Sequence, residues 1–466
     1  MNFHKFESVF VILLGIFFGL FYFAKISFAA TISSVSCSQT DVQAAISTTV
    51  NGDTVVLPIC PSGGSGSGYV SISKNITIQG AGASSTVINQ YGWFISNGTD
   101  GVRITGVGSN YGGAPYDGST YIKVGNGYSS AGPANFRIDH CTISNYDMPV
   151  WIGAKSKGVI DDNQFFGSMG NGILYYADAL CNAAGDWSSP IDYGSSGWVF
   201  IENNYFNNQN GSTLQDIMGW MGAKYVIRYN TFEETVNPSA PNNPLGAIFD
   251  MHGELGSGAA SGRAAEIYNN KIIIKSNKWT RLFNIRGGTG LIFNNQVDYS
   301  LAGSDSNIVS YVNLWNARAR PASSNDANAA ACPNLGAPNR FCATADGGEG
   351  YSCVQQIGQG VRGGTQEPMY IWNNTRSGDG NTWAAFPSPN VDADVQWAIS
   401  QNRDYCLYST STSCNSITTT YTSYACPNPL TGYSGSCDSS VAGIAGYNIE
   451  APDTTPPAAP TGVQVN

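Results

Sequence analysis

A four-residue pattern recurs seven times along the chain, and it constrains the fold more than any other feature of the sequence. Each copy begins with isoleucine, and most end in a pair of asparagines, as in Ile201-Glu202-Asn203-Asn204. The copies occupy residues 138–141, 160–163, 201–204, 227–230, 267–270, 292–295 and 371–374. A short tail typical of a strand, such as Tyr205-Phe206, follows each copy. The closest copies lie 22 to 26 residues apart, and the longer spacings fit repeats that carry insertions.

A repeat of this size cannot bury its own apolar face, so successive repeats must stack. Stacked strands lie about 4.8 Å apart, which predicts columns of inward-facing Ile and Phe and hydrogen-bonded ladders of Asn at a bend. A β-propeller is the alternative all-β fold, but it needs four strands in each repeat of about 40 residues. The repeat is too short for that, so the sequence predicts an all-β solenoid.

The segments around the first repeats resemble the entry turns of a known superfamily. These segments are residues 52–58 and 76–82, and a short amphipathic capping helix is expected at 41–46. Together with an interior turn at 136–143, they make the chain similar to the pectin lyase-like superfamily. The resemblance covers residues 31–380 and implies a right-handed parallel β-helix. It does not define the reaction, because this superfamily contains lyases, hydrolases, esterases, epimerases and adhesive surface proteins.

The N-terminus predicts export. Lys5 precedes an apolar run at residues 9–24, and the small residues at 27–30 suit a signal peptidase. We expect residues 1–30 to be a cleaved signal peptide, with an uncleaved membrane anchor as the alternative, and we expect no membrane span after cleavage. The protein is therefore expected to be secreted or held at the cell surface.

Charged residues are sparse and their balance is negative. They make up 12% of the chain, and the formal net charge is −10. Nucleic acid is excluded as a partner, because its binding needs a concentrated basic surface. The resemblance implies a polysaccharide or a cell-surface glycan as the partner, and the oligomeric state stays open.

The eleven cysteines fit an oxidising compartment, and seven of them lie in the C-terminal third. We expect disulfides among these seven to staple C-terminal loops, with an irregular Cys-rich region at 381–450 and a Pro-rich linker or tail at 451–466. A zinc site is disfavoured, because the sequence has no Cys-x-x-Cys pair and its three histidines are scattered. The odd count leaves one thiol unpaired, for which we expect Cys141.

Three hydrophobic segments that lead into insertions align on a shared glycine, at residues 217–222, 248–253 and 282–287. The alignment without gaps places Met221, His252 and Arg286 in one column. Gly219, Asp250 and Asn284 then form a second column on the same face. The ionisable residues of these columns lie within about 7 Å of one another in such an arrangement, so they are the candidate site.

Lyases of the superfamily cleave acidic polysaccharides by β-elimination, and the resemblance implies roles for these residues. Arg286 and Asn284 would bind the uronate carboxylate, and His252 would be the base, held in one tautomer by Asp250. Lys224, which follows the first aligned segment, is the substitute base.

A cofactor prediction rests on carboxylates at the same face. Asp216, Asp250 and Glu254 would instead hold Ca²⁺, which binds carboxylate oxygens. No other cofactor is expected.

Aromatic and basic residues supply the expected substrate contacts. Tyr175, Tyr176 and Trp220 lie in or beside insertions, where their rings suit the apolar faces of sugars. Arg263 would add local positive charge for a polyanionic substrate.

Three alternatives remain open from the sequence. In the first, Arg286 pairs with Asp250 only to hold the insertions, and His252 is a hydrogen-bonded turn residue. In the second, the protein is a non-catalytic surface, adhesive or glycan-binding β-helix. The third, a glycoside hydrolase, ranks below the lyase because the pair Asp161-Asp162 falls in the repeat bend.

Overall fold

The computed structural model describes most of the chain between residues 29 and 432. The described residues are 29–112, 118–125, 134–153, 155–167, 170–177, 191–208, 215–234, 246–252, 261–275, 280–302, 304, 308–315, 356–358, 366–392, 396, 399–407 and 421–432. The expected signal peptide and the Pro-rich tail at 451–466 lie outside them.

The described strands form three long sheets, which we call sheets A, B and C. Sheet A contains β1 (Thr31–Ser33), β2 (Thr54–Val56), β4 (Thr77–Gln79), β6 (Asp100–Thr105), β9 (Asn135–Asp139), β12 (Lys157–Asp161), β15 (Val199–Glu202), β18 (Lys224–Arg228), β21 (Ala264–Tyr268), β24 (Thr289–Phe293), β27 (Met369–Trp372) and β31 (Tyr405–Leu407). Sheet B contains β7 (Gly108–Asn110), β10 (Thr142–Ser144), β13 (Gln164–Phe166), β16 (Tyr205–Asn208), β19 (Thr231–Glu234), β22 (Lys271–Ile274), β25 (Gln296–Asp298), β28 (Thr375–Ser377) and β29 (Ala384–Ala385). Sheet C contains β3 (Tyr69–Ile72), β5 (Gly92–Ile95), β8 (Thr120–Val124), β11 (Met148–Ile152), β14 (Ile173–Tyr176), β17 (Gln215–Trp220), β20 (Gly246–Met251), β23 (Thr280–Ile285), β26 (Ile308–Leu314) and β30 (Asn390–Val391).

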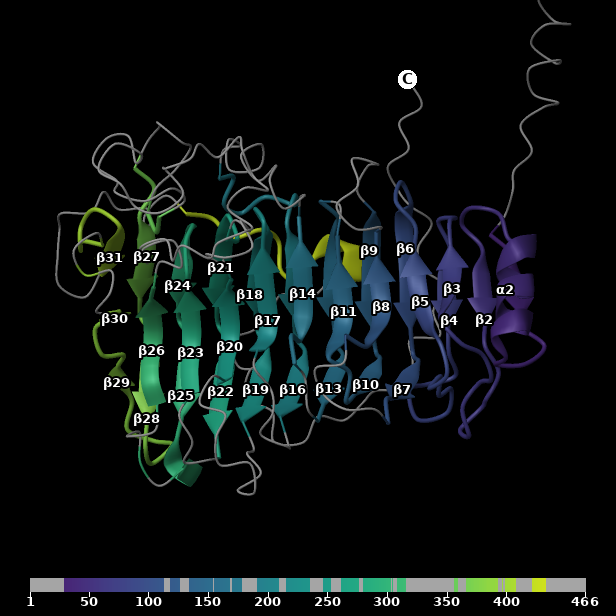
Figure 1. Ribbon diagram of the computed structural model, residues 1–466, viewed down its shortest axis with the longest axis horizontal. Coiled ribbons are helices and arrows are strands. Elements are labelled where there is room, and N and C mark those ends of the chain that lie inside the picture. Colours follow the sequence, from purple (N-terminus) through teal and green to yellow (C-terminus); the bar gives the residue numbers. More distant parts are fainter. Residues whose placement is uncertain are drawn as a thin grey trace, which may run out of the picture.

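Each turn of the chain passes from sheet A to sheet B to sheet C, so strands that are neighbours in a sheet come from successive turns (Figure 1). The strands within each sheet pair in parallel, apart from β29, which runs antiparallel to β28. The chain is thus a right-handed parallel β-helix, and the fold implied by the resemblance is confirmed. The parallel strand pairing of sheet A continues to β31, beyond residue 380, where the β-helix was expected to end.

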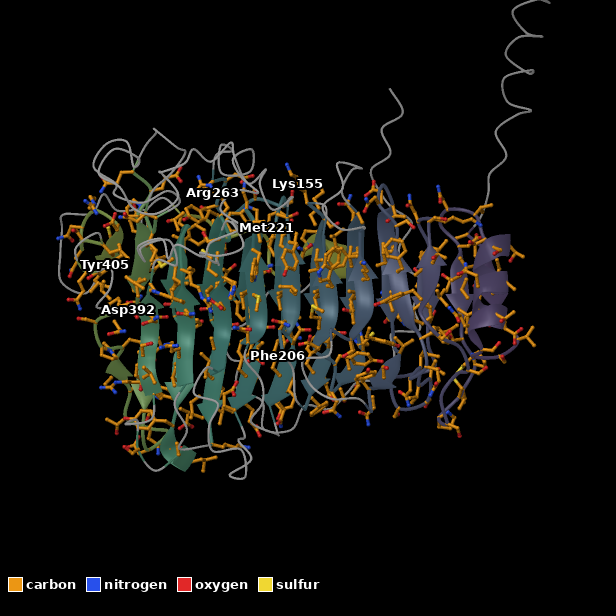
Figure 2. All side chains as sticks on the ribbon, viewed as in Figure 1. Lys155, Phe206, Met221, Arg263, Asp392 and Tyr405 are labelled. Carbon is orange, nitrogen blue, oxygen red and sulfur yellow. A yellow bond between two sulfur atoms is a disulfide. The ribbon has the colours of Figure 1, made fainter. Side chains whose placement is uncertain are left out.

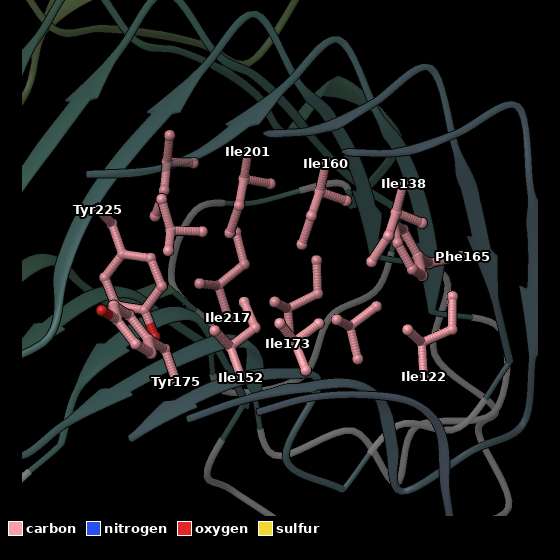
Figure 3. Packing of buried hydrophobic residues seen from close by; sticks show 14 of the residues in the cluster. Ile122, Ile138, Ile152, Ile160, Phe165, Ile173, Tyr175, Ile201, Ile217 and Tyr225 are labelled. Atoms are coloured by element: carbon pink, nitrogen blue, oxygen red, sulfur yellow. The ribbon is translucent and has the colours of Figure 1, made fainter. Parts of the chain in front are cut away.

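The predicted columns are present in the core. Ile138, Ile160 and Ile201 occupy equivalent positions in adjacent strands of sheet A, and the column continues through every later quartet. Phe165 and Phe206 stack in sheet B with ring centroids 4.8 Å apart. Figure 3 shows the isoleucines of sheet A opposite those of sheet C across the interior.

The predicted asparagine ladder is also present, at the bend between sheets A and B. The side chains of Asn163, Asn204, Asn230, Asn270, Asn295 and Asn374 are buried and joined by amide hydrogen bonds of 2.9 to 3.1 Å. The residue before each ladder position has a positive φ of 50 to 57°. Asn tolerates this left-handed conformation better than most residues, which explains the recurring Asn pair. Asp162 takes the bend position of its turn.

Three short helices are described: α2 (Gln39–Thr48), η1 (Ser300–Ala302) and η5 (Pro429–Thr431). The capping helix expected at 41–46 is confirmed by α2, which lies at the N-terminal end of the solenoid (Figure 1). Ser38 caps it by accepting a hydrogen bond from the backbone N–H of Asp41. Among the described residues, no helix is long and apolar enough to cross a membrane.

The cysteines follow the predictions only in part. Cys141 is buried and unpaired, as expected. Cys37 and Cys60 form a disulfide near the N-terminus that the sequence did not predict. Cys406 and Cys426 each take part in a disulfide, and the other cysteines of the C-terminal third lie outside the described residues.

Residues 421–432, which we call the strap, pack along the outer face of sheet A. Arg228 donates to the backbone carbonyls of Tyr424 and Ala425, each at 2.8 Å, and Arg137 donates to that of Thr431 at 2.8 Å. In Figure 1 the strap, in yellow, passes behind the solenoid, on the side away from sheet C. The outer face of sheet A is therefore occupied here by the chain itself.

Candidate functional site

The strands β17, β20, β23 and β26 place the candidate residues on the outer face of sheet C. Asp250 pairs in register with Asn284, so His252 and Arg286, two residues further on, are also neighbours. This part of the expected alignment agrees with the structure.

The alignment of β17 with β20 was wrong by one residue. Met218, rather than Gly219, lies opposite Asp250, and Trp220, rather than Met221, lies beside His252. The register is set by Ile217 and Phe249, which pair with each other and are both buried in the core. A slip of one residue would move such side chains to the opposite face, so core packing outweighs the shared glycine.

Asp250 is the centre of the cluster, and its carboxylate is fully buried. Arg286 binds it through two donors, with Nε 3.0 Å from Oδ1 and Nη2 2.6 Å from Oδ2. His252 Nδ1 lies 2.8 Å from Oδ2. Asn284 donates to Oδ1 at 3.0 Å, and Gln215 donates to Oδ2 at 3.2 Å. Charge-assisted and bidentate bonds of this kind hold donors in fixed positions.

The charge state of Asp250 determines the tautomer of His252. Burial opposes ionisation of Asp250, but the charge of Arg286 and then that of His252 outweigh it, so the pKa of Asp250 lies below its ordinary value. An ionised carboxylate only accepts hydrogen bonds, so the proton must sit on His252 Nδ1. When His252 carries only this proton, its Nε2 atom is the proton acceptor.

An aromatic ring packs against each of the side chains of His252 and Arg286. The Trp220 ring stacks on the His252 ring with centroids 4.1 Å apart. The Arg286 guanidinium lies over Trp315, 4.8 Å from its centroid. The side chains of His252 and Arg286 are 9% and 15% exposed, so both reach solvent only at their edges.

An asparagine row extends from Asp250 along the outer face. Asn313 donates to Asn284 Oδ1 at 2.9 Å, and Asn390 donates to Asn313 Oδ1 at 2.7 Å. Each amide donates toward Asp250, so the carboxylate fixes the orientation of the row.

Lys224 does not belong to this strand group. It begins β18 in sheet A, and its Nζ lies 3.3 Å from Asp192 Oδ1 and 6.0 Å from the Trp198 ring centroid. The sequence missed this because Lys224 follows a sharp turn at 221–223 that moves the chain from sheet C to sheet A.

Arg263 is fully buried and forms an ion pair of 2.6 Å with Glu367, which does not fit the expected contact with substrate. Figure 2 places Arg263 near Met221, at the edge where sheet C passes into sheet A.

The two neighbouring tyrosines point to opposite faces of β14, as alternation requires. Tyr175 lies in the core, where it donates to the Ser156 carbonyl at 3.0 Å and packs edge-on against Tyr225 (Figure 3). This position does not fit the substrate contact that the sequence predicted for it. Tyr176 is on the outer face, 5.5 Å from Trp220 and 6.0 Å from Trp151 between ring centroids.

The calcium prediction remains a prediction. Asp216 is buried, Asp250 is engaged as above, and Glu254 lies outside the described residues. Among the described residues, no group of three Asp, Glu, His or Cys side chains is arranged to hold a metal ion.

Sequence reasoning missed Gln215, Asn313, Trp315 and Asn390, which complete the face. Gln215 contacts Asp250 from the strand that was misaligned, and the other three lie on β26, just after it, and on β30, outside the aligned segments. Extending the alignment to the segment 308–315 would have found two of them.

No protein-family model matches the sequence, and no curated protein matches it. Two solved structures are similar to part of the chain. An alginate lyase from Paenibacillus sp. str. FPU-7 has 20% identity and a TM-score of 0.38, over 57% of this chain and 95% of the lyase. A mutant of the PL6 family alginate lyase AlyGC has 14% identity and a TM-score of 0.32, over 57% of this chain and 38% of the lyase. The assignment of the fold rests on the strand pairing of this chain.

The low pKa of Asp250 predicts how stability depends on pH. Because its folded-state pKa is below the unfolded value, the ionised carboxylate stabilises the fold above about pH 4, and this contribution is lost as the pH falls through the folded pKa. The difference in unfolding free energy between wild type and Asp250→Asn should therefore shrink as the pH falls below about 4, by at most about 1.4 kcal/mol per pH unit. Urea denaturation at about pH 5 and pH 3 measures it. An equal difference at both values would contradict the pKa shift.

Proposed function

We propose that this protein is a secreted polysaccharide lyase that cleaves an acidic polysaccharide by β-elimination. The observation that carries the proposal is the Asp250 carboxylate, which holds His252 and Arg286 side by side on the outer face of sheet C.

His252 is the proposed base. With Nδ1–H bound to Asp250, its Nε2 would take the proton from the carbon next to the uronate carboxylate. The bond to the neighbouring glycosidic oxygen then breaks, a carbon–carbon double bond forms, the leaving oxygen takes a proton from water, and His252 releases its proton to the solvent. The stacking of Trp220 on the imidazole fixes the plane of the ring, so the base is positioned before the substrate binds.

Positive charge is the second requirement, because the carbanion that develops beside the carboxylate must be stabilised. Arg286 and Asn284 border the base, and Arg286 keeps donors beyond the two that Asp250 accepts. The row of Trp151, Tyr176 and Trp220 along the same face offers rings on which sugars stack.

A non-catalytic glycan-binding protein is the second candidate function. It is favoured by the bidentate ion pair and the low exposure of Arg286, since a buried pair of this kind also serves to hold strands together.

The test uses the full secreted chain and polysaccharides of mannuronate, guluronate, galacturonate or glucuronate, with Ca²⁺ and with a chelator. A lyase produces unsaturated uronates, which absorb in the ultraviolet. New reducing ends without this absorbance would indicate a hydrolase instead. Retention of the protein by one polysaccharide in affinity electrophoresis, without cleavage, would replace the lyase by the glycan-binding protein. Loss of activity in the chelator would support a bound metal ion.

A further inference from the structure

A second row of residues, polar except for Ala247, lies three residues before the Asp250 row in each strand of sheet C. Gln215 on β17, Ala247 on β20, Arg281 on β23 and Ser310 on β26 are in register across sheet C. Gln215 reaches Asp250 with its amide, so this row shares the outer face with the cluster. A β-bulge lies where Thr280 and Arg281 pair with β26, and bulges near functional sites re-aim side chains.

Three polar atoms of this row lack hydrogen-bond partners within the described part of the protein. The Arg281 Nε, Ser310 Oγ and Gln215 Oε1 atoms are buried, and none of them has a hydrogen-bond partner among the described residues. The Ser310 and Gln215 side chains belong to residues that are only 6% and 5% exposed. Buried polar atoms are nearly always paired, because an unpaired one loses its hydration without compensation.

Arg281 and Arg286 differ in whether an acidic side chain pairs with the guanidinium. Arg286 is bound to the Asp250 carboxylate through two donors. No acidic partner is recorded for Arg281 in the described residues, although its Nε is buried. A guanidinium whose Nε is buried and that has no acidic partner among the described residues favours the binding of an anion, and its planar fork of donors matches a carboxylate.

We propose that Arg281 and Ser310 form the subsite that binds the carboxylate of a uronate, and that Gln215 Oε1 accepts a hydrogen bond from a hydroxyl of the same sugar or its neighbour. Arg281 and Ser310 sit on adjacent strands, whereas Gln215 is two strands from Arg281, about 10 Å away. Arg281 and Ser310 would donate to an anion at one end of the row, and Gln215 would accept from a hydroxyl at the other end. This combination suits a sugar acid. The proposal rests on the proposed function for its substrate class, but the binding it describes does not require catalysis.

The test compares binding of oligouronate tetrasaccharides with binding of the same tetrasaccharides after reduction of their carboxyl groups to alcohols. Isothermal titration calorimetry on the full chain should give tighter binding of the carboxylated form. Arg281→Gln should weaken that binding by about 10- to 100-fold and leave binding of the reduced form unchanged. Ser310→Ala should weaken it less, since one neutral donor is removed.

Lys157→Gln is the matched control, because it removes the same charge from an exposed position on sheet A. It should leave both affinities unchanged, which separates local contact from long-range attraction. The melting temperature of Arg281→Gln should stay close to that of wild type, because the buried Arg281 Nε has no hydrogen-bond partner to lose among the described residues.

Equal affinity of wild type for carboxylated and reduced sugars would overturn the subsite, and so would an equal loss of affinity in Lys157→Gln and Arg281→Gln. Arg281-dependent binding of uronates without any cleavage would keep the subsite and reject the lyase. Cleavage that is unaffected by Arg281→Gln would keep the lyase and reject the subsite.

Discussion

Replacing His252 by asparagine is expected to lower kcat for β-elimination by about 10²- to 10⁴-fold, which is the usual contribution of a positioned general base. KM should change little, because His252 is proposed to act on the proton that is transferred rather than to hold the sugar. Asparagine retains a donor for the Asp250 carboxylate, so the ion pair between Asp250 and Arg286 should persist. Initial rates from ultraviolet absorbance on the preferred polysaccharide measure both constants.

His140→Asn is the matched control, because His140 sits in a constellation of the same kind. Its Nδ1 lies 2.8 Å from Asp139, and Arg103 binds the same carboxylate at 2.8 and 2.6 Å. Burial opposes protonation of His140, but the hydrogen bond and charge of Asp139 outweigh it and raise the pKa of His140, which makes it a poor base. Asparagine occupies the same left-handed bend position in later turns, such as Asn203, so the backbone is preserved.

The two histidine variants separate catalysis from folding. Wild-type kcat in His252→Asn would exclude His252 as the base. An equal loss of kcat in both variants, with lower melting temperatures, would assign the two Asp–His–Arg sets to structure and would favour the glycan-binding protein.

Replacing Asn230 by alanine is expected to lower the free energy of unfolding by about 3 to 5 kcal/mol, because it removes a central member of the buried ladder. The Asn230 amide donates to the Ile201 carbonyl at 2.8 Å, to the Arg228 carbonyl at 3.1 Å and to Asn270 Oδ1 at 3.1 Å. Its oxygen accepts from the backbone N–H and the side chain of Asn204, at 3.0 and 3.1 Å. Alanine removes these five bonds and deprives the buried backbone N–H of Asn204 of its acceptor, although Asn204 Nδ2 and Asn270 Oδ1 keep other partners. The shift of the urea denaturation midpoint measures the effect.

Asn294→Gly is the control for the ladder. Asn294 lies in an equivalent bend but is exposed, and its φ of 54° suits glycine. The expected change is below about 1 kcal/mol, because only the bend position is altered. If Asn230→Ala were as mild as Asn294→Gly, the ladder would not be a main source of stability.

The positions of the candidate site residues were partly predictable from the sequence. Whether each strand was aligned correctly depends on which of its own residues face the core. Asp250, Asn284 and Arg286 were placed correctly relative to one another, because β20 and β23 carry the same spacing of core residues. The neighbouring strand β17 was shifted by one residue, since its register depends on Ile217 facing the core rather than on the glycine after it.

The sequence by itself determined the stacking of the turns, the isoleucine column and the asparagine ladder. These features repeat because every turn must meet the same requirement: apolar side chains inward and a buried amide to satisfy the bend. Each copy of the quartet carries that information locally, so the pattern can be read without a structure.

Only the tertiary structure decided which polar residues share one face and which faces remain open. Tyr175 and Arg263 are buried by contacts with other turns, and the strap covers sheet A from nearly 200 residues further along the chain than Arg228. Register between turns joined by insertions depends on packing summed over many side chains, and no short motif records it. The three buried polar atoms around Arg281 that lack partners among the described residues were likewise visible only once the neighbours of each polar atom were known.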